Sequence, residues 1–218
     1  MTFSLRQKIL AEFIGTYFLV LTVVGSGIMG ELMSNDLGII LLGNTIATGA
    51  ILYVIISMFI NISGAYFNPA VVLSDIIQKN IPINYGIVFI ITQIIAAIFG
   101  CLTANWYFEY PIIEWSLNER VGVFKFFSEI IATAGLLLTI FILKEVNKER
   151  IAIGVDLFIT AGYWFTSSTS FANPAVTIGR MFTDSFSGIS PSSVLSFVLA
   201  QIIGALIATI IVRLFYKN

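Results

Sequence analysis

Two short stretches of sequence decide the fold of this chain: SGAYFNPAV at residues 63–71 and SFANPAV at residues 170–176. Each contains Asn-Pro-Ala, and each is followed by a short apolar run. An asparagine directly before a proline signals a helix start, because the asparagine caps the helix and the proline fits its first turn. The sequence therefore predicts two short helices, Pro69–Ile77 and Pro174–Phe182, both too short to cross a membrane.

The rest of the chain has the composition of a membrane protein. Hydrophobic residues make up 58% of its 218 residues and charged residues only 11%, whereas a soluble domain carries about 25% charged residues. The first apolar run is too long for a signal peptide, so we interpret it as a span. Six stretches are long enough to span a bilayer as helices: 9–30, 37–60, 84–107, 122–143, 151–168 and 192–215. The predicted fold class is an all-α membrane protein with six transmembrane helices and two half-helices.

The charges of the loops and termini predict the orientation. One side carries the positive residues Arg6, Lys8, Lys144, Lys148, Arg150, Arg213 and Lys217. The opposite loops are mainly acidic, with Glu31, Asp36, Glu109, Glu114 and Glu119 against a single Arg120. Positive residues favour the cytoplasmic side, so both termini are expected in the cytoplasm. Because outer-membrane proteins are usually barrels, helical spans favour the inner (plasma) membrane.

The two halves of the chain repeat each other. Three motifs recur in the same order: AEFIGT (11–16) as SEIIAT (128–133), NPAV (68–71) as NPAV (173–176), and QIIAA (93–97) as QIIGA (201–205). A duplicated unit with three spans must enter the membrane upside down the second time. We therefore predict a single domain, 1–218, built from inverted repeats at about 1–110 and 118–218, with its functional site at the membrane midplane.

The half-helices give this midplane its chemistry. Entering from opposite faces, they meet with their N-termini at the centre, and irregular backbone at that depth must line a cavity or be buried in protein. Each N-terminus carries about half a positive charge, which disfavours cations. The amides of Asn68 and Asn173 can donate to a passing oxygen, and a water held by two donors cannot relay a proton along a file. The pattern predicts a pore for small uncharged molecules.

Several other functions are disfavoured by what the sequence lacks. It has no histidine, which is the commonest metal ligand and the usual general base, and its single cysteine, Cys101, lies in an apolar run. No acid, base or metal cluster of the kind that an enzyme needs is visible, and a net charge of −1 gives no reason to expect nucleic acid. We expect no catalytic residue, metal or cofactor, and we expect the lipid bilayer and small neutral solutes as partners.

These motifs resemble the major intrinsic protein (aquaporin) family over nearly the whole chain. The residues that carry the resemblance are those of 11–16, 63–71 and 173–175, together with Glu129. It implies the aquaporin fold, a homotetramer with one pore per subunit, and a pore centre made of Asn68, Pro69, Ala70, Asn173, Pro174 and Ala175. It also implies that Glu12 and Glu129 are buried and hold the pore loops by accepting backbone N–H groups. The alternative for Glu12 is a position near the headgroups.

The selectivity filter departs from the family's usual pattern. Members usually place an arginine three residues after the second asparagine, where this chain has Val176. The other three filter positions correspond to Thr48, Ala161 and Ser170, or to Gly162 if the register of Ala161 slips. This set has neither ring nor charge and implies a wide, uncharged filter.

Neighbouring side chains leave alternatives to that wide filter. Arg180 lies seven residues after Asn173, too far for the usual place of the arginine, so we expect it to face elsewhere or to anchor the loop. The alternative is that Tyr163, Trp164 or Phe165 intrudes and narrows the pore, although their helical spacing favours lipid or neighbouring helices.

Residues 161–180 and Thr48 resemble the bacterial arsenic-associated aquaporins, in which valine replaces the filter arginine. This resemblance implies a passive channel for water, glycerol-like polyols, arsenous acid and methylated arsenicals. A water-selective aquaporin is one alternative, and a proton-coupled transporter for small solutes is another. Asp75 and Lys79 are expected at the cytoplasmic mouth, and Asp156 is expected either in a vestibule or beside a loop lysine.

Overall fold

The computed structural model describes residues 2–216, so Lys217 lies outside the described part. Within it the chain forms helices and connections, without a strand. The long helices are α1 (Leu5–Met33), α2 (Leu37–Phe59), α4 (Ile83–Tyr107), α5 (Val123–Val146), α6 (Ile151–Phe165) and α8 (Pro191–Tyr216). The short ones are α3 (Pro69–Ile77), α7 (Pro174–Gly179) and the 3₁₀ turns η1 (Lys148–Arg150) and η2 (Arg180–Phe182).

Five of the long helices are long and apolar enough to cross a membrane, and α6 is the exception. Its 15 residues rise about 22 Å at 1.5 Å per residue, less than the roughly 30 Å of a bilayer core. The sequence predicted a span to residue 168, but the helix ends at Phe165. Thr166 turns back to cap it, since its backbone N–H and its hydroxyl both donate to the carbonyl of Gly162. The chain then continues without helix to Asn173.

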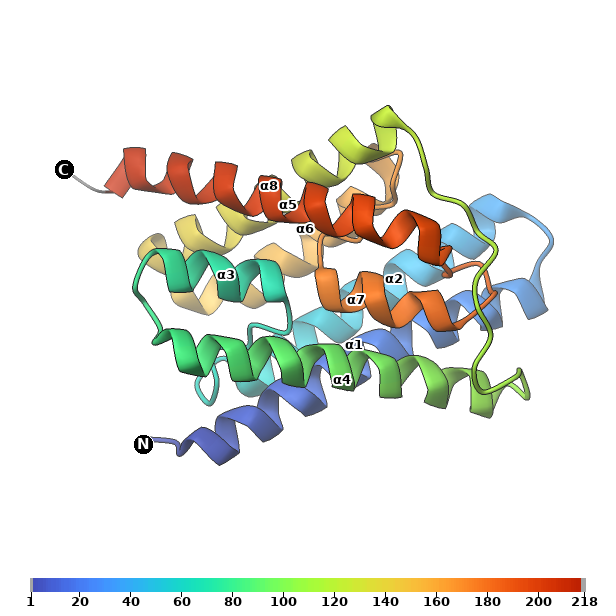
Figure 1. The fold of residues 1–218 in the computed structure, drawn as a ribbon, viewed down its shortest axis with the longest axis horizontal. Helices are drawn as coiled ribbons and strands as arrows, with labels where there is room; N and C mark the ends of the chain where they lie inside the picture. The colour runs from blue at the N-terminus through green and yellow to red at the C-terminus, as the bar shows by residue number, and fades with distance from the viewer. Residues whose placement is uncertain (1, 217–218) are drawn as a thin grey trace.

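The half-helices lie at the centre of a bundle formed by the long helices (Figure 1). Helix α1 packs against α2 and α4, α5 packs against α6 and α8, and α2 packs against α6 across the two halves. Helices α3 and α7 contact each other and run to opposite ends of the molecule (Figure 1). We call the end where α1 begins and α8 ends the terminal end, and the opposite one the far end.

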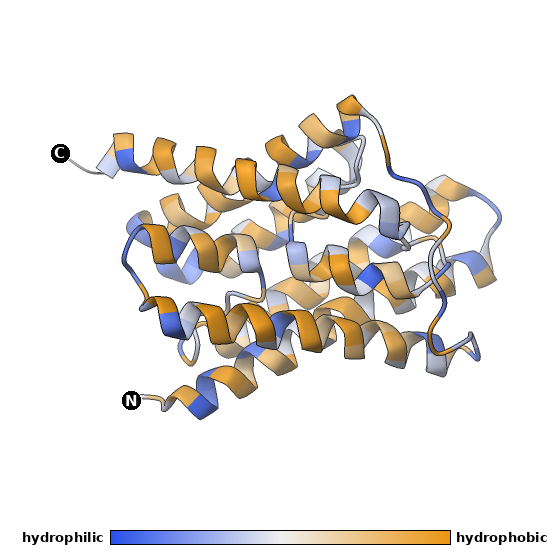
Figure 2. Ribbon diagram, viewed as in Figure 1, coloured by the Kyte–Doolittle hydropathy of each residue, from blue (hydrophilic) through white to orange (hydrophobic). Residues whose placement is uncertain are grey.

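The outside of the bundle is apolar. Hydrophilic residues gather at the ends and connections, whereas the long helices are mostly hydrophobic (Figure 2). Large apolar side chains such as Ile46, Ile91 and Leu206 are exposed on these helices. Inside, the helices approach closely: a Cβ atom at Gly15 of α1 would lie 2.1 Å from the ring of Phe67. Glycine at this position therefore lets the loop before α3 pack directly on α1.

Each half-helix begins as the sequence predicts, with asparagine as its cap and proline in its first turn. The Oδ1 atom of Asn68 accepts the N–H of Ala70, and that of Asn173 accepts the N–H groups of Ala175 and Val176. The second half-helix tightens to the 3₁₀ turn η2 after Gly179, so only its first part is α-helical.

Candidate functional site

A cavity of about 270 Å³ extends from the terminal end of the bundle past the half-helices to Tyr163 and Arg180. Asp75, Lys144 and Lys148 line it at the terminal end, Asn68 and Asn173 in the middle. Thr48, Tyr163 and Arg180 line it towards the far end. Most of its wall is apolar, formed by residues such as Leu52, Leu136 and Ile159. Polar groups are thus confined to three levels of an otherwise apolar path.

At the middle level the two asparagines bind the opposite half of the chain. The Nδ2 atom of Asn68 donates to the carbonyl of Ala172 at 2.8 Å, and that of Asn173 donates to the carbonyl of Phe67 at 2.8 Å. Since a primary amide has two N–H groups, each asparagine retains one more donor. Both residues line the cavity, so these donors and the two helix N-termini face the same path.

Glu12 fixes the first pore loop from behind. Its side chain is fully buried and accepts four donors: the hydroxyl of Ser63, the N–H groups of Tyr66 and Phe67, and the Nε2 of Gln93. Glu12 therefore lies in the interior and not at the headgroups. All four partners belong to the first half of the chain.

Glu129 does the same for the second pore loop. It is fully buried and accepts the N–H groups of Phe171 and Ala172, both at 2.9 Å, and the Nε2 of Gln201 at 2.7 Å. Because Glu129 accepts the N–H of Ala172, the carbonyl of Ala172 remains available to accept the amide of Asn68. The glutamate thus positions the acceptor that orients the opposite asparagine.

The pore loops adopt a backbone conformation that side chains rarely accept. Phe67 and Ala172, each directly before its asparagine, have φ of +49°, and Ala65 and Ser170 have φ of +51° and +50°. A left-handed residue other than glycine costs roughly 1–3 kcal/mol and persists only where its surroundings determine it. Here the two glutamates and the reciprocal asparagine bonds supply that constraint.

Towards the far end, Tyr163 and Arg180 define a narrow point. A second cavity of about 200 Å³, lined also by Asn44, Arg120 and Phe186, opens beyond them. Among the described residues, Tyr163 and Arg180 are the ones that line both cavities. The Tyr163 hydroxyl lies 3.1 Å from the hydroxyl of Thr48, so the ring is fixed beside the path.

Arg180 is buried at this point and held from two sides. Its guanidinium carbon lies 3.5 Å from the ring centroid of Phe171, a cation–π contact. Its Nε donates to the carbonyl of Ser187. Guanidinium carries five N–H donors, so the Nη groups remain to face the cavities that the residue lines. A charged group therefore stands at a level where the sequence predicted small uncharged residues.

The four predicted filter residues are not all brought together. Thr48, Ser170 and Val176 line the main cavity, but Ala161 lies on the exposed face of α6. Gly162 is the neighbour that faces inward, since a Cβ there would lie 2.7 Å from the Ser170 hydroxyl oxygen. The helix register thus differs by one residue from the first expectation, as its alternative allowed.

A large side chain and a charged one, Tyr163 and Arg180, line the cavity beside the residues predicted to form a wide, uncharged filter. The inward register that takes Ala161 out of the cavity brings in Tyr163, while Trp164 and Phe165 point outward, 53% and 55% exposed. Sequence spacing gave a signal for Tyr163 only as an alternative. It gave none for Arg180, whose long side chain returns towards the half-helix N-terminus from η2.

Asp156 has neither of the positions expected for it. It faces α2, where a Cβ at Gly49 would lie 2.4 Å from its Oδ1, and it accepts a hydrogen bond from the hydroxyl of Thr160. It therefore lies at the α2–α6 contact, outside the lining of both cavities, and among the described residues it forms no ion pair with a lysine.

Both the sequence and the fold of this chain are similar to those of known proteins. The chain is 42% identical to the aquaglyceroporin AqpS of Rhizobium meliloti (strain 1021), over 97% of this chain and 91% of that protein. It is 34% identical to a probable TIP-type aquaporin of Medicago truncatula, over 78% and 72%. Its fold matches the X-ray structure of the aquaglyceroporin from Plasmodium falciparum with a TM-score of 0.73 at 21% identity, covering 99% of this chain and 96% of that one.

The family model for major intrinsic proteins matches residues 1–152 and 143–218, which together include the entire chain. The paired Asn-Pro-Ala half-helices, the buried glutamates and the central cavity agree with this match. The chain belongs to the major intrinsic protein family.

Proposed function

We propose that the protein is a passive channel that conducts water and small neutral solutes such as glycerol along its central cavity, in either direction. The observation that carries the proposal is the middle level of the cavity. There, one free N–H group of Asn68 and one of Asn173 face the path between two helix N-termini. Such donors orient a neutral oxygen-bearing molecule, and the helix dipoles repel a cation. Aquaporins and aquaglyceroporins of the major intrinsic protein family are channels, so the protein is not an enzyme.

We further propose that Thr48, Tyr163, Arg180 and Val176 act as the selectivity filter. Arg180 and Tyr163 offer hydrogen-bond donors, and Val176 offers an apolar wall. A polyol has hydroxyl groups along one side and carbon–hydrogen groups along the other, so it matches a filter of this kind. This supports glycerol-sized solutes over water alone. Arsenous acid, a neutral polyhydroxyl species of similar size, is the further solute we propose, on the valine at position 176.

The membrane setting is part of the same proposal. Most of the described lysines and arginines, such as Arg6, Lys144 and Arg213, lie where helices reach the terminal end, so we place that end and both chain termini in the cytoplasm of a cell with this protein in its inner membrane. A homotetramer is proposed from the family, with one pore in each subunit.

Stopped-flow light scattering on proteoliposomes tests the solutes directly. Vesicles would be challenged in turn with sucrose, glycerol and arsenous acid, alongside protein-free vesicles and the variant Val176→Trp, whose ring should block the cavity. Fast shrinkage in sucrose and fast reswelling in glycerol and arsenous acid, both lost in Val176→Trp, are expected. Fast water flux without either solute would leave a water-selective channel. Fluxes equal to protein-free vesicles would reject the proposal.

A further inference from the structure

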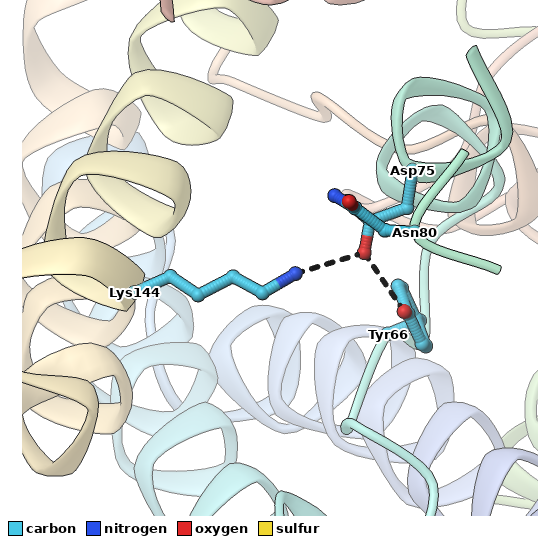
Figure 3. Close-up of polar contacts among 4 residues, drawn as sticks. All are labelled: Tyr66, Asp75, Asn80 and Lys144. Atoms are coloured by element: carbon cyan, nitrogen blue, oxygen red, sulfur yellow. Dashed lines mark hydrogen bonds and ion pairs between the residues drawn. The ribbon is translucent and has the colours of Figure 1, made fainter. Parts of the chain in front are cut away.

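The mouth of the cavity at the terminal end contains an ion pair between the two halves of the chain (Figure 3). Lys144, in the last turn of α5, places its Nζ 3.2 Å from Oδ2 of Asp75 on α3. Both residues line the cavity. Since α3 belongs to the first half and α5 to the second, the pair bridges the path where a solute enters.

The aspartate in this pair is rigidly held. Its Oδ2 also accepts the hydroxyl of Tyr66 at 2.8 Å, and its Oδ1 accepts the Nδ2 of Asn80 at 2.7 Å. The backbone N–H of Asn80 donates to the Asp75 carbonyl, and the backbone N–H of Tyr66 donates to Glu12. The side chain of Asp75 is only 2% exposed. Neutral donors from its own half thus fix this carboxylate whether or not lysine is present.

The lysine is the mobile partner. Its side chain is 37% exposed, and it reaches the aspartate along a flexible four-carbon stem. Without it, the neutral donors would leave a carboxylate with uncompensated charge at the entrance. A fixed carboxylate beside a water-filled path attracts cations, as rings of acidic residues do in cation channels.

We propose that Lys144 is a tethered cation that occupies a cation-binding site at the channel mouth, formed by the carboxylate of Asp75, which Tyr66 and Asn80 hold in place. It keeps dissolved cations from binding there and obstructing neutral solutes, and its stem narrows the entrance. Lys144 and Asp75 are therefore specificity-determining residues, separate from the far-end filter. This inference rests on the proposed channel function.

The test compares a cation with a neutral molecule of the same size. Glycerol flux into proteoliposomes would be measured with guanidinium chloride or urea added at about 50 mM. Guanidinium binds a carboxylate through two parallel N–H bonds and carries a positive charge. Urea has a similar size and shape but is neutral. In Lys144→Met, guanidinium should lower the flux about twofold, which corresponds to a weak site with a Kd of about 50 mM, while urea should not. The parent and Lys79→Met, which removes an exposed charge outside the cavity lining, should resist both compounds.

Two further variants make the result decisive. The double variant Asp75→Asn/Lys144→Met should lose the block, because the carboxylate is gone. Lys144→Met/Lys148→Met should keep it, which excludes replacement of one lysine by the other. A Lys144→Met channel that conducts but resists guanidinium, or equal block with and without Asp75, would overturn the inference. If the parent passes water but not glycerol, the same comparison is made on water flux, so failure of the proposed solute does not affect this test.

Discussion

The two half-helices have matching centres but different outer ends. Tyr66 and Phe171 stand two residues before their asparagines, and Asp75 and Arg180 stand seven residues after. In the first half the tyrosine hydroxyl donates to the aspartate at 2.8 Å, whereas in the second half the arginine lies 3.5 Å from the phenylalanine ring. At these two equivalent positions, the terminal mouth therefore has a carboxylate bound to a hydroxyl, and the far mouth has a guanidinium packed on an aromatic ring.

This difference separates two tasks. The central asparagines and the buried glutamates have corresponding contacts in both halves, because a barrier to charge at the midplane needs both helix N-termini. The mouths face different solutions and need no such correspondence. We infer that the centre of the cavity excludes charged solutes, and that the two mouths select neutral solutes by shape and hydrogen bonding.

The largest expected effect comes from removing a glutamate of the centre. Glu129→Ala leaves three buried donors unpaired, and each costs about 1–3 kcal/mol. Glu12→Ala leaves four. Both variants should lose most folded protein, measured as monodisperse yield and thermal unfolding midpoint in detergent. The exposed Glu145→Ala is the control, and parent-like midpoints for both buried positions would show that the loops are held in another way.

At the far end, Val176→Arg should reduce glycerol flux about tenfold and water flux less. A second guanidinium would stand close to Arg180 in a narrow part of the cavity, where bulk obstructs the larger solute first. Stopped-flow rates for the two permeants give the ratio, and Val176→Leu controls for size without charge. An unchanged ratio would mean that Val176 does not face the conduction path.

Alanine variants of the two central asparagines should differ in thermal stability but should increase proton leak to a similar extent. Asn173→Ala removes two cap bonds and Asn68→Ala one, and a lost cap costs about 1 kcal/mol. Asn173→Ala should therefore unfold at the lower temperature. Both should raise proton leak several-fold, measured with a pH dye inside vesicles under an imposed potential. Parent-level leak in both variants would place the barrier in the helix dipoles alone.

The smallest effects on flux concern the aromatic partners at the mouths. Phe171→Leu removes the ring that Arg180 and Arg120 both contact, and a cation–π contact is worth about 0.5–2 kcal/mol. Tyr66→Phe removes one hydrogen bond to a carboxylate, worth about 1.5–3 kcal/mol. Phe171→Leu should loosen Arg180 and change the glycerol-to-water ratio, whereas Tyr66→Phe should leave that ratio unchanged. The opposite pattern would reverse the assignment of the filter to the far end.

The fold was predictable because its signals are local. Apolar runs of spanning length and an asparagine–proline pair each act within a few residues, and both half-helices begin where these signals lie. The end of α6 was not predictable from hydropathy, since Thr166 stops the helix by a side-chain bond to Gly162.

The residues that line the cavity towards the far end were predictable only in part. Thr48, Ser170 and Val176 line the cavity as spacing suggested, because helix and loop positions near the asparagines are fixed by the backbone. A one-residue difference in helix register moves a side chain by about 100°, which exchanges Ala161 for Gly162 and draws in Tyr163. The position of Arg180 depends on a side chain that folds back onto Phe171, and residue spacing contains no information about that direction.

The reciprocal bonds of the asparagines have a consequence for the order of assembly. Glu12 binds partners only from the first half among its described contacts, and Glu129 only from the second. Each half can therefore complete its own loop as it leaves the ribosome. The amide of Asn68, however, must wait for the carbonyl of Ala172, which follows it 104 residues later in the chain. A growing chain thus inserts two halves whose pore loops are each held from within, and the asparagine bonds across the centre form only when the halves dock.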